Sequence, residues 1–218
     1  MTRQELREKF RAENPEITDR VIGDATLNSW METANEEVCC ETRCIVTNET
    51  EVFDSSTAGA FYDLESNITN FHDIDDMPGG GVYYDDEPLV KASPGEMNYK
   101  KRTWKSAASG TPKYYWRRGK YLWLHPAPDD DDIEIGVDCI LRPDAFDSED
   151  EEPFSGLGHL QAYSDAINKY LQWRCKSKVG KGEEAMTAEK DFASYVAWMK
   201  KRVKGSKYGS IYIKPADR

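Results

Sequence analysis

The spacing of apolar residues changes twice along this chain of 218 residues, and this change constrains the fold more than any single motif. Before about Arg43 the apolar residues recur at helical intervals. From Cys44 to about Asp147, short apolar and β-branched runs alternate with glycine, proline and aspartate, as in strands joined by turns. The helical interval then returns. The pattern predicts an α+β protein in which an antiparallel β module is inserted into a helical bundle.

The helical bundle is expected to comprise residues 1–45 and 154–204. Its first helix covers Thr2 to Glu13 and ends before Pro15, because a residue that precedes proline avoids the α conformation. The two C-terminal helices form a hairpin that breaks at Gly180-Lys181-Gly182. The apolar stripes of the three longer helices are Leu27, Trp30, Met31, Ala34 and Val38; Leu160, Tyr163, Ile167, Tyr170 and Leu171; and Met186, Phe192, Tyr195, Val196, Met199 and Val203.

The inserted β module is expected to span residues 46–147. Its predicted strands are Ile45 to Phe53, Phe61 to Leu64, Phe71 to Ile74, Gly81 to Tyr84, Leu89 to Lys91, Pro112 to Arg117, Tyr121 to His125 and Ile133 to Leu141. Arg118-Gly119 is the predicted turn of a hairpin, because glycine supplies a positive φ. A short helix is expected from Pro94 to Trp104, with Ser93 as its N-cap. Alternation and aromatic density predict a core that includes Trp104, Tyr115, Leu122, Leu124 and Ile135.

The net charge of the chain limits the classes of partner that it can bind. It has 40 acidic and 29 basic residues, a formal charge of −11, which argues against coating nucleic acid or binding a membrane surface. The charged segment Met1 to Arg11 lacks the apolar region of a secretion signal, and no run of eighteen apolar residues occurs. We therefore expect neither a signal peptide nor a transmembrane helix.

No motif announces an active site, and the block of residues nearest to a metal cluster is His72, Asp73, Asp75 and Asp76. A small metal-dependent hydrolase could use this block, but its other histidines, His125 and His159, stand isolated, so an exposed acidic loop is the favoured interpretation. The five cysteines lack the pattern of a zinc site and are expected to be reduced structural thiols. We expect no catalytic, cofactor-binding or metal-binding residues.

Two charge blocks of opposite sign lie near the C-terminal half. Asp147 to Glu152 holds five acids in six residues, whereas Lys200 to Arg218 holds seven basic residues and one acid. Residues 205–218 show no helical period and are expected to form an extended docking tail for an acidic groove, although they could instead fold back on the parent helices. The residues expected to carry docking are Lys207, Tyr208, Ile211, Tyr212, Ile213, Lys214 and Arg218.

The centre of the chain carries a family resemblance. Trp104 is followed by Gly110-Thr111-Pro112-Lys113-Tyr114-Tyr115-Trp116, then by an apolar strand ending in Pro126-Ala127-Pro128-Asp129, and later by Arg142-Pro143. This order, with its flanking helices, resembles the head-to-tail adaptor (connector) proteins of tailed bacteriophages over roughly residues 20–203. The hairpin residues that carry the resemblance are Gly110, Thr111, Pro112, Tyr114, Tyr115, Gly119, Leu122, Leu124, Pro126 and Pro128.

The resemblance implies a structural protein of the virion neck, made in the cytoplasm of a bacterial host and catalysing nothing. Such adaptors form a homo-oligomeric ring, commonly of twelve copies, between the portal protein above and a neck or tail protein below. The ring extends the DNA channel, and DNA would pass through its lumen without specific binding and without any contact with a membrane. The alternatives are a head-closure or tail-terminator protein, the metal-dependent hydrolase described above, and a stand-alone host binding protein.

Overall fold

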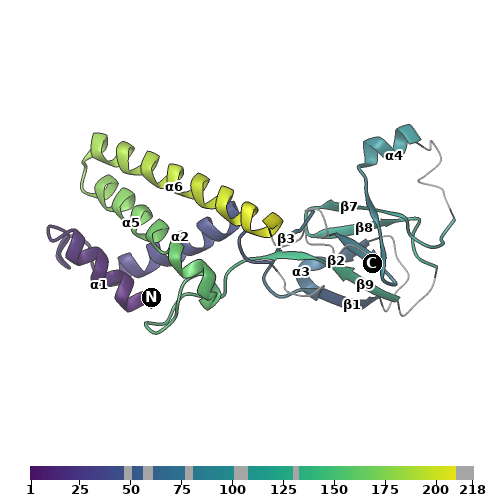
Figure 1. Ribbon diagram of the computed structural model, residues 1–218, viewed down its shortest axis with the longest axis horizontal. Coiled ribbons are helices and arrows are strands. Elements are labelled where there is room, and N and C mark those ends of the chain that lie inside the picture. The colour runs from purple at the N-terminus through teal and green to yellow at the C-terminus, as the bar shows by residue number, and fades with distance from the viewer. Residues whose placement is uncertain (47–50, 56–60, 77–80, 101–107, 130–132, 210–218) are drawn as a thin grey trace, which may run out of the picture. The chain divides into compact units, whose positions relative to one another are not determined.

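A computed structural model describes residues 1–218 except 47–50, 56–60, 77–80, 101–107, 130–132 and 210–218 (Figure 1). The chain divides into two compact units. The helical unit consists of Met1–Ile45 and Arg142–Arg218, and the β unit consists of Val46–Leu141. The predicted α+β class is confirmed, since helices dominate the first unit and short sheets the second.

The first helix, α1 (Arg3–Glu13), begins and ends where the sequence predicts. The side-chain oxygen of Thr2 accepts a hydrogen bond from the Glu5 N–H, and the Glu5 carboxylate accepts one from the Thr2 N–H, which together form a capping box. Leu6 and Phe10 are fully buried. At the other end the Asn14 side-chain amide donates to the Phe10 carbonyl, 2.8 Å away, so the helix closes before the proline.

The second helix, α2 (Asp24–Thr42), buries four of the five residues of its predicted stripe, namely Leu27, Met31, Ala34 and Val38. It ends at Arg43, which has a φ of 55° and donates its N–H to the Cys39 carbonyl. The C-terminal hairpin consists of α5 (Asp165–Lys178) and α6 (Gly182–Gly209), which pack along each other and against α2. Two short 3-10 turns, η2 (Phe154–Gly156) and η3 (Gly158–Tyr163), lead into α5.

Two predictions for α6 are wrong. Met186 is 60% exposed, and the positions one and two turns before Phe192 that face inward are Ala188 and Ala185. Their small size hides them from a search for large apolar residues. The expected extended tail also starts too early, because Gly205 to Gly209 belong to α6. The helix passes Gly205 since one glycine costs about 1 kcal/mol, too little to end a helix of 28 residues.

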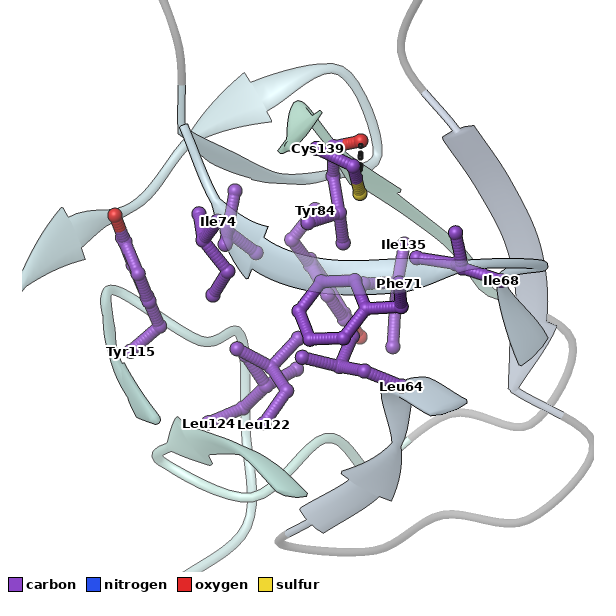
Figure 2. Close-up of a cluster of buried hydrophobic side chains, with 12 residues drawn as sticks. Leu64, Ile68, Phe71, Ile74, Tyr84, Tyr115, Leu122, Leu124, Ile135 and Cys139 are labelled. Carbon is purple, nitrogen blue, oxygen red and sulfur yellow. Dashed lines mark hydrogen bonds between the residues drawn. The ribbon is translucent and has the colours of Figure 1, made fainter. Parts of the chain in front are cut away.

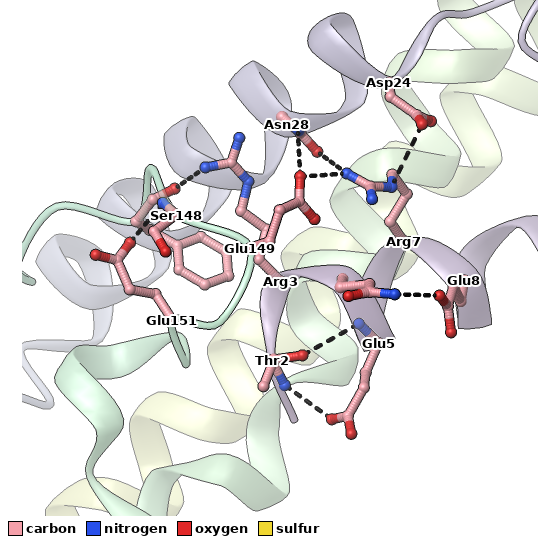
Figure 3. Close-up of polar contacts among 12 residues, drawn as sticks. Thr2, Arg3, Glu5, Arg7, Glu8, Asp24, Asn28, Ser148, Glu149 and Glu151 are labelled. Carbon is pink, nitrogen blue, oxygen red and sulfur yellow. Dashed lines mark hydrogen bonds and ion pairs between the residues drawn. The ribbon is translucent and has the colours of Figure 1, made fainter.

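The acidic segment that precedes the hairpin lies against the first turn of α1 (Figure 3). The N–H groups of Arg3 and Gln4 donate to the carbonyls of Glu151 and Glu149, at 2.8 and 3.1 Å. Arg7 also forms an ion pair with Glu149 at 2.8 Å. The segment therefore supplies acceptors to donors that the first turn of a helix leaves unpaired. Backbone carbonyls of Glu149 and Glu151 and the carboxylate of Glu149 therefore hold the first turns of α1.

In the described residues of the β unit, ten strands form sheets of order β1-β9-β4-β5 and β2-β8-β7-β6 and a separate pair β10-β3. The strands are β1 (Glu51–Ser55), β2 (Phe61–Asp63), β3 (Phe71–Ile74), β4 (Val82–Tyr84), β5 (Glu87–Pro88), β6 (Val90–Lys91), β7 (Tyr114–Arg118), β8 (Tyr121–His125), β9 (Ile133–Val137) and β10 (Cys139–Leu141). All pairs are antiparallel except β6 with β7. That one parallel pair departs from the predicted antiparallel module, and it arises because the connection from β6 to β7 passes through a helix.

Two helices lie in the described part of the β unit. The connection between β6 and β7 contains α4 (Pro94–Lys100), where Ser93 and Glu96 form the predicted N-terminal cap. The predicted end of this helix, Trp104, lies outside the described residues. The second helix, α3 (Leu64–Asn67), replaces the end of a predicted strand, because the Asp63 carboxylate accepts the Ser66 N–H and turns the chain.

A single residue divides the long strand predicted from Ile133 to Leu141. The Asp138 carboxylate accepts hydrogen bonds from the Gly81 N–H and the Tyr83 hydroxyl, each at 3.0 Å. Its own backbone carbonyl accepts from the Asp75 N–H at 2.7 Å. Asp138 thereby lies between β9, which pairs with β1 and β4, and β10, which pairs with β3. The Val46 backbone also forms an isolated antiparallel bridge with Ile140, so the two ends of the β unit lie side by side.

One cluster of buried side chains joins the three sheets (Figure 2). Four of the predicted core residues, Tyr115, Leu122, Leu124 and Ile135, are in it and are at most 3% exposed, which confirms them. The fifth, Trp104, lies outside the described residues. The remaining members are Leu64, Ile68, Phe71, Ile74, Val82, Tyr84, Val137 and Cys139.

Candidate interaction surfaces

The β7–β8 hairpin is built around a two-residue turn at Gly119-Lys120, one residue later than predicted. Gly119 has a φ of 61°, the conformation in which glycine is favoured over other residues. Alternate residues of the two strands then face opposite sides of the sheet. Tyr115, Leu122 and Leu124 face the core, so these predicted site residues hold the fold together.

The ends of the hairpin are held by backbone contacts. The Gly110 N–H donates to the Ala127 carbonyl at 2.8 Å, and the Lys113 N–H donates to the His125 carbonyl at 2.9 Å. Of the other hairpin residues expected to carry the resemblance, Pro112 and Pro128 are buried, Tyr114 and Pro126 are half-buried, and Thr111 and Gly119 are exposed. Most of the hairpin motif is thus structural.

The opposite face of the same sheet carries a row of aromatic rings. Trp123 stacks on Trp116 with 6.1 Å between centroids, and Phe61 lies 5.0 Å from Trp123 on its other side. Phe61 also meets Tyr121 edge-on at 5.6 Å. Phe61 is 53% exposed and Tyr121 is 37% exposed. The row was not predicted as a site, although the alternation of aromatic and aliphatic residues in β8 indicates it.

Two carboxylates of the candidate metal-binding block, Asp73 and Asp76, form ion pairs with basic side chains. Asp73 forms an ion pair with Arg117, and Asp76 forms one with Lys91. Burial raises the pKa of Tyr115 to about 12, and the nearby Asp76 carboxylate adds to the effect. Across the part of the chain that the structure describes, no group of three or more His, Cys, Asp or Glu side chains is placed to hold a metal ion. Asp73 and Asp76 therefore contribute to packing between strands.

The cysteines are free thiols, and four of the five are buried. The pKa of Cys39 is raised, mainly by a hydrogen bond with Cys44 and secondly by burial of the thiol. Burial raises the pKa of Cys175 to about 12. Because the thiolate is the form that attacks electrophiles and binds metals, these two side chains are poorly reactive.

The helical unit has an open groove between α2 and α6. Phe192, Ala193, Val196 and Ala197 of α6 line it, and Glu41 pairs with Lys200 at 2.8 Å. Burial raises the pKa of Glu37, which also lines the groove. An apolar floor with charged edges is typical of a surface that packs against protein.

The predicted docking tail is only partly described. Lys207 and Tyr208 lie in α6, whereas Ile211, Tyr212, Ile213, Lys214 and Arg218 lie outside the described residues.

No helix in the described ranges is both long and apolar enough to cross a membrane.

The fold and these surfaces define a class: an α+β structural protein whose conspicuous surfaces are aromatic, apolar and charged patches suited to protein contacts. The family model described as the SU10 adaptor protein matches residues 1–209, and the chain belongs to that family. It is a phage head-to-tail adaptor and a structural component of the virion, as the resemblance in its central hairpin implies. None of the curated proteins matches the chain.

Proposed function

We propose that the chain is the subunit of a homo-oligomeric ring of twelve copies that joins the portal to the neck or tail and extends the DNA channel. The observation that carries the proposal is the family match over residues 1–209. In this role the protein catalyses nothing, and its work is done by contacts with the portal above, the neck or tail protein below and neighbouring copies. Electron microscopy of the purified chain mixed with portal rings tests it, because a ring of extra density on one face of the portal is expected.

The charge of the two units supports a channel role. The β unit, residues 46–141, has 18 acidic and 9 basic residues, a formal charge of −9. The helical unit carries the remaining −2 of the total of −11. Repeated around a ring, acidic surfaces repel phosphates, so DNA would pass through the lumen without adhering.

The DNA prediction follows from this charge. The purified chain is expected not to retard double-stranded DNA in a gel at physiological salt, because its net charge of −11 opposes binding to phosphates. A protein known to bind double-stranded DNA, run in the same gel, serves as the positive control for the assay. Tight binding by the natural chain that weakens as salt rises would contradict the repelling lumen.

The C-terminal residues are proposed to dock on the portal. Tyr208, Ile211, Tyr212 and Ile213 offer apolar contacts, while Lys207, Lys214 and Arg218 favour an acidic receptor and would steer the segment toward it. Because α6 continues to Gly209, it carries Lys207 and Tyr208, and the helix would present the segment that follows.

Deleting residues 210–218 tests the docking tail without cutting α6. The truncated chain is expected to keep its thermal unfolding midpoint but no longer to co-purify with portal, because it has lost three of the four apolar anchors. Removing only Asp217 and Arg218 is the matched control and should retain most of the binding. Unchanged portal binding by the longer deletion would show that docking uses another surface.

A further inference from the structure

A second aromatic surface lies on the C-terminal hairpin. Trp198 of α6 is 44% exposed, and the rings of Tyr163 and Tyr195 lie 5.7 and 5.2 Å from it. The Arg202 guanidinium lies 5.5 Å from the Trp198 ring centre, and the Lys169 ammonium lies 5.7 Å from that of Tyr195. We call these five residues the Trp198 patch. Tryptophan, tyrosine and arginine together are the residue types that dominate binding energy at protein interfaces.

The patch is positively charged. The neighbouring Asp165 is paired with Lys9 at 2.7 Å, so it does not neutralise Lys169 and Arg202. The whole stretch from the start of α5 to the end of α6, Asp165 to Gly209, has 11 basic and 5 acidic residues, a formal charge of +6. The surface therefore fits a partner that is acidic as well as able to cover an exposed indole ring.

The β unit of the same chain offers such an acidic surface. Asp85 and Asp86 form the two-residue turn between β4 and β5, with φ values of 51° and 62°. The exposed carboxylates of Asp85, Asp86 and Glu87 lie at the end of the sheet beside Glu134, whose carbonyl accepts the Asp85 N–H at 3.2 Å. We call these four residues the Asp85 turn. None of its carboxylates pairs with a cation elsewhere in the described part of the chain.

We propose that the Trp198 patch of one copy binds the Asp85 turn of the next copy. The inference rests on the ring assembly proposed above. A ring requires two different, complementary surfaces on each subunit, because the same surface on both partners would close a dimer. The charges of +6 on the hairpin and −9 on the β unit supply that complementarity, and the exposed indole supplies an apolar anchor.

Nucleic acid is the other acidic class that a basic aromatic surface fits. The chain as a whole is strongly negative, and the three rings of the patch pack on one another through edge-on and tilted contacts. Such packing leaves no parallel platform on which successive bases could stack. A second copy is therefore the partner that the observations favour, and DNA binding becomes an outcome of the test.

The test uses two full-length variants, each with one surface removed. The patch variant is Trp198→Ser with Arg202→Glu, and the turn variant is Asp85→Asn, Asp86→Gly and Glu87→Lys. Asn-Gly suits a turn with two positive φ values, so the second variant keeps its hairpin. The matched control, Met186→Ser with Lys190→Glu, makes the same kinds of change at exposed positions of the same helix. Circular dichroism establishes that all three are folded.

Self-association is measured by sedimentation at low and at physiological salt. The natural chain and the control are expected to associate, more strongly at low salt. Each variant alone is expected to associate about 30-fold more weakly, the loss typical of one hot-spot residue. An equimolar mixture of the two variants should form heterodimers that grow no further, since one matching pair of surfaces remains intact.

Three results would overturn the proposal. They are a natural chain that stays monomeric at both salt concentrations, a mixture that forms no heterodimer, and DNA binding that the patch variant loses. Portal binding by the natural chain, measured in parallel, separates this inference from the proposed function. If portal binding fails, the ring role fails; if only the heterodimer fails, the ring uses other contacts.

Discussion

An aspartate at position 122 is expected to prevent the β unit from folding. Leu122 is fully buried in the cluster that joins the three sheets. Removing a buried leucine costs about 2 to 5 kcal/mol, and burying an unpaired carboxylate adds several more. The sum is comparable with the entire stability of a typical domain, about 5 to 15 kcal/mol. We therefore expect insoluble protein from Leu122→Asp, and the same from Leu124→Asp.

The control for this experiment is the neighbouring residue in the same strand. Tyr121 faces the other side of the sheet and is 37% exposed, so Tyr121→Asp places the same carboxylate where water can reach it. It should give soluble protein whose unfolding midpoint falls only modestly, through the lost contact with Phe61. The measurements are soluble yield and denaturant unfolding followed by tryptophan fluorescence. A soluble Leu122→Asp variant with an unchanged midpoint would contradict the position of β8.

Replacing Arg11 with Ala is expected to cost the helical unit about 3 kcal/mol. Its guanidinium donates to the carbonyls of Ile17 and Ile22 at 2.7 and 3.1 Å and also binds the carboxylates of Asp19 and Asp24. One side chain therefore organises the loop between α1 and α2. A hydrogen bond from a charged group contributes about 1.5 to 3 kcal/mol, and each acceptor left unpaired adds to the loss.

The Arg11 prediction has a pH dependence of known sign. The hydrogen bond from Arg11 is the largest cause that holds the pKa of Asp24 below its usual range. A depressed carboxylate pKa contributes stability above the unfolded pKa, and that contribution is lost as the pH falls through the folded value. The difference in the free energy of unfolding between the natural chain and the Arg11→Ala variant should therefore become smaller below about pH 4. Denaturant unfolding followed by far-UV circular dichroism measures this difference.

The control is Arg20→Ala, which replaces an exposed arginine of the same loop and should change the free energy of unfolding little. Equal losses of stability in the two variants would refute the role of Arg11.

The parts of the fold that could be predicted are those encoded by local pattern. Leu6 and Phe10 on α1, four of the five stripe residues of α2 and the inward residues of β8 follow short-range signals, and the structure buries them as expected. The parts of the fold that could not be predicted depend on contacts between residues that are far apart in the sequence. Asp138 divides a strand because Gly81 and Tyr83, distant in sequence, donate to its carboxylate. The inward Ala185 and Ala188 carry too little apolar surface to stand out.

The candidate surfaces show the same division. The hairpin from Gly110 to Pro128 is visible as a motif, but sequence alone does not tell which of its residues are core and which are surface. Phe61 joins Trp123 only because β2 pairs with β8, which no local pattern specifies. Trp198 meets Tyr163 across the boundary between two elements. Surfaces assembled in this way need the pairing of strands and helices before they can be recognised.

The antiparallel bridge between Val46 and Ile140 has an evolutionary consequence. Because the two ends of the β unit are held side by side, the segment between them is an insertion whose ends adjoin. Recombination could exchange or trim such an insertion without moving the termini to which the helices are attached. The exchanged segment would lie within residues 46–141, so the residues of the helical unit would be unchanged.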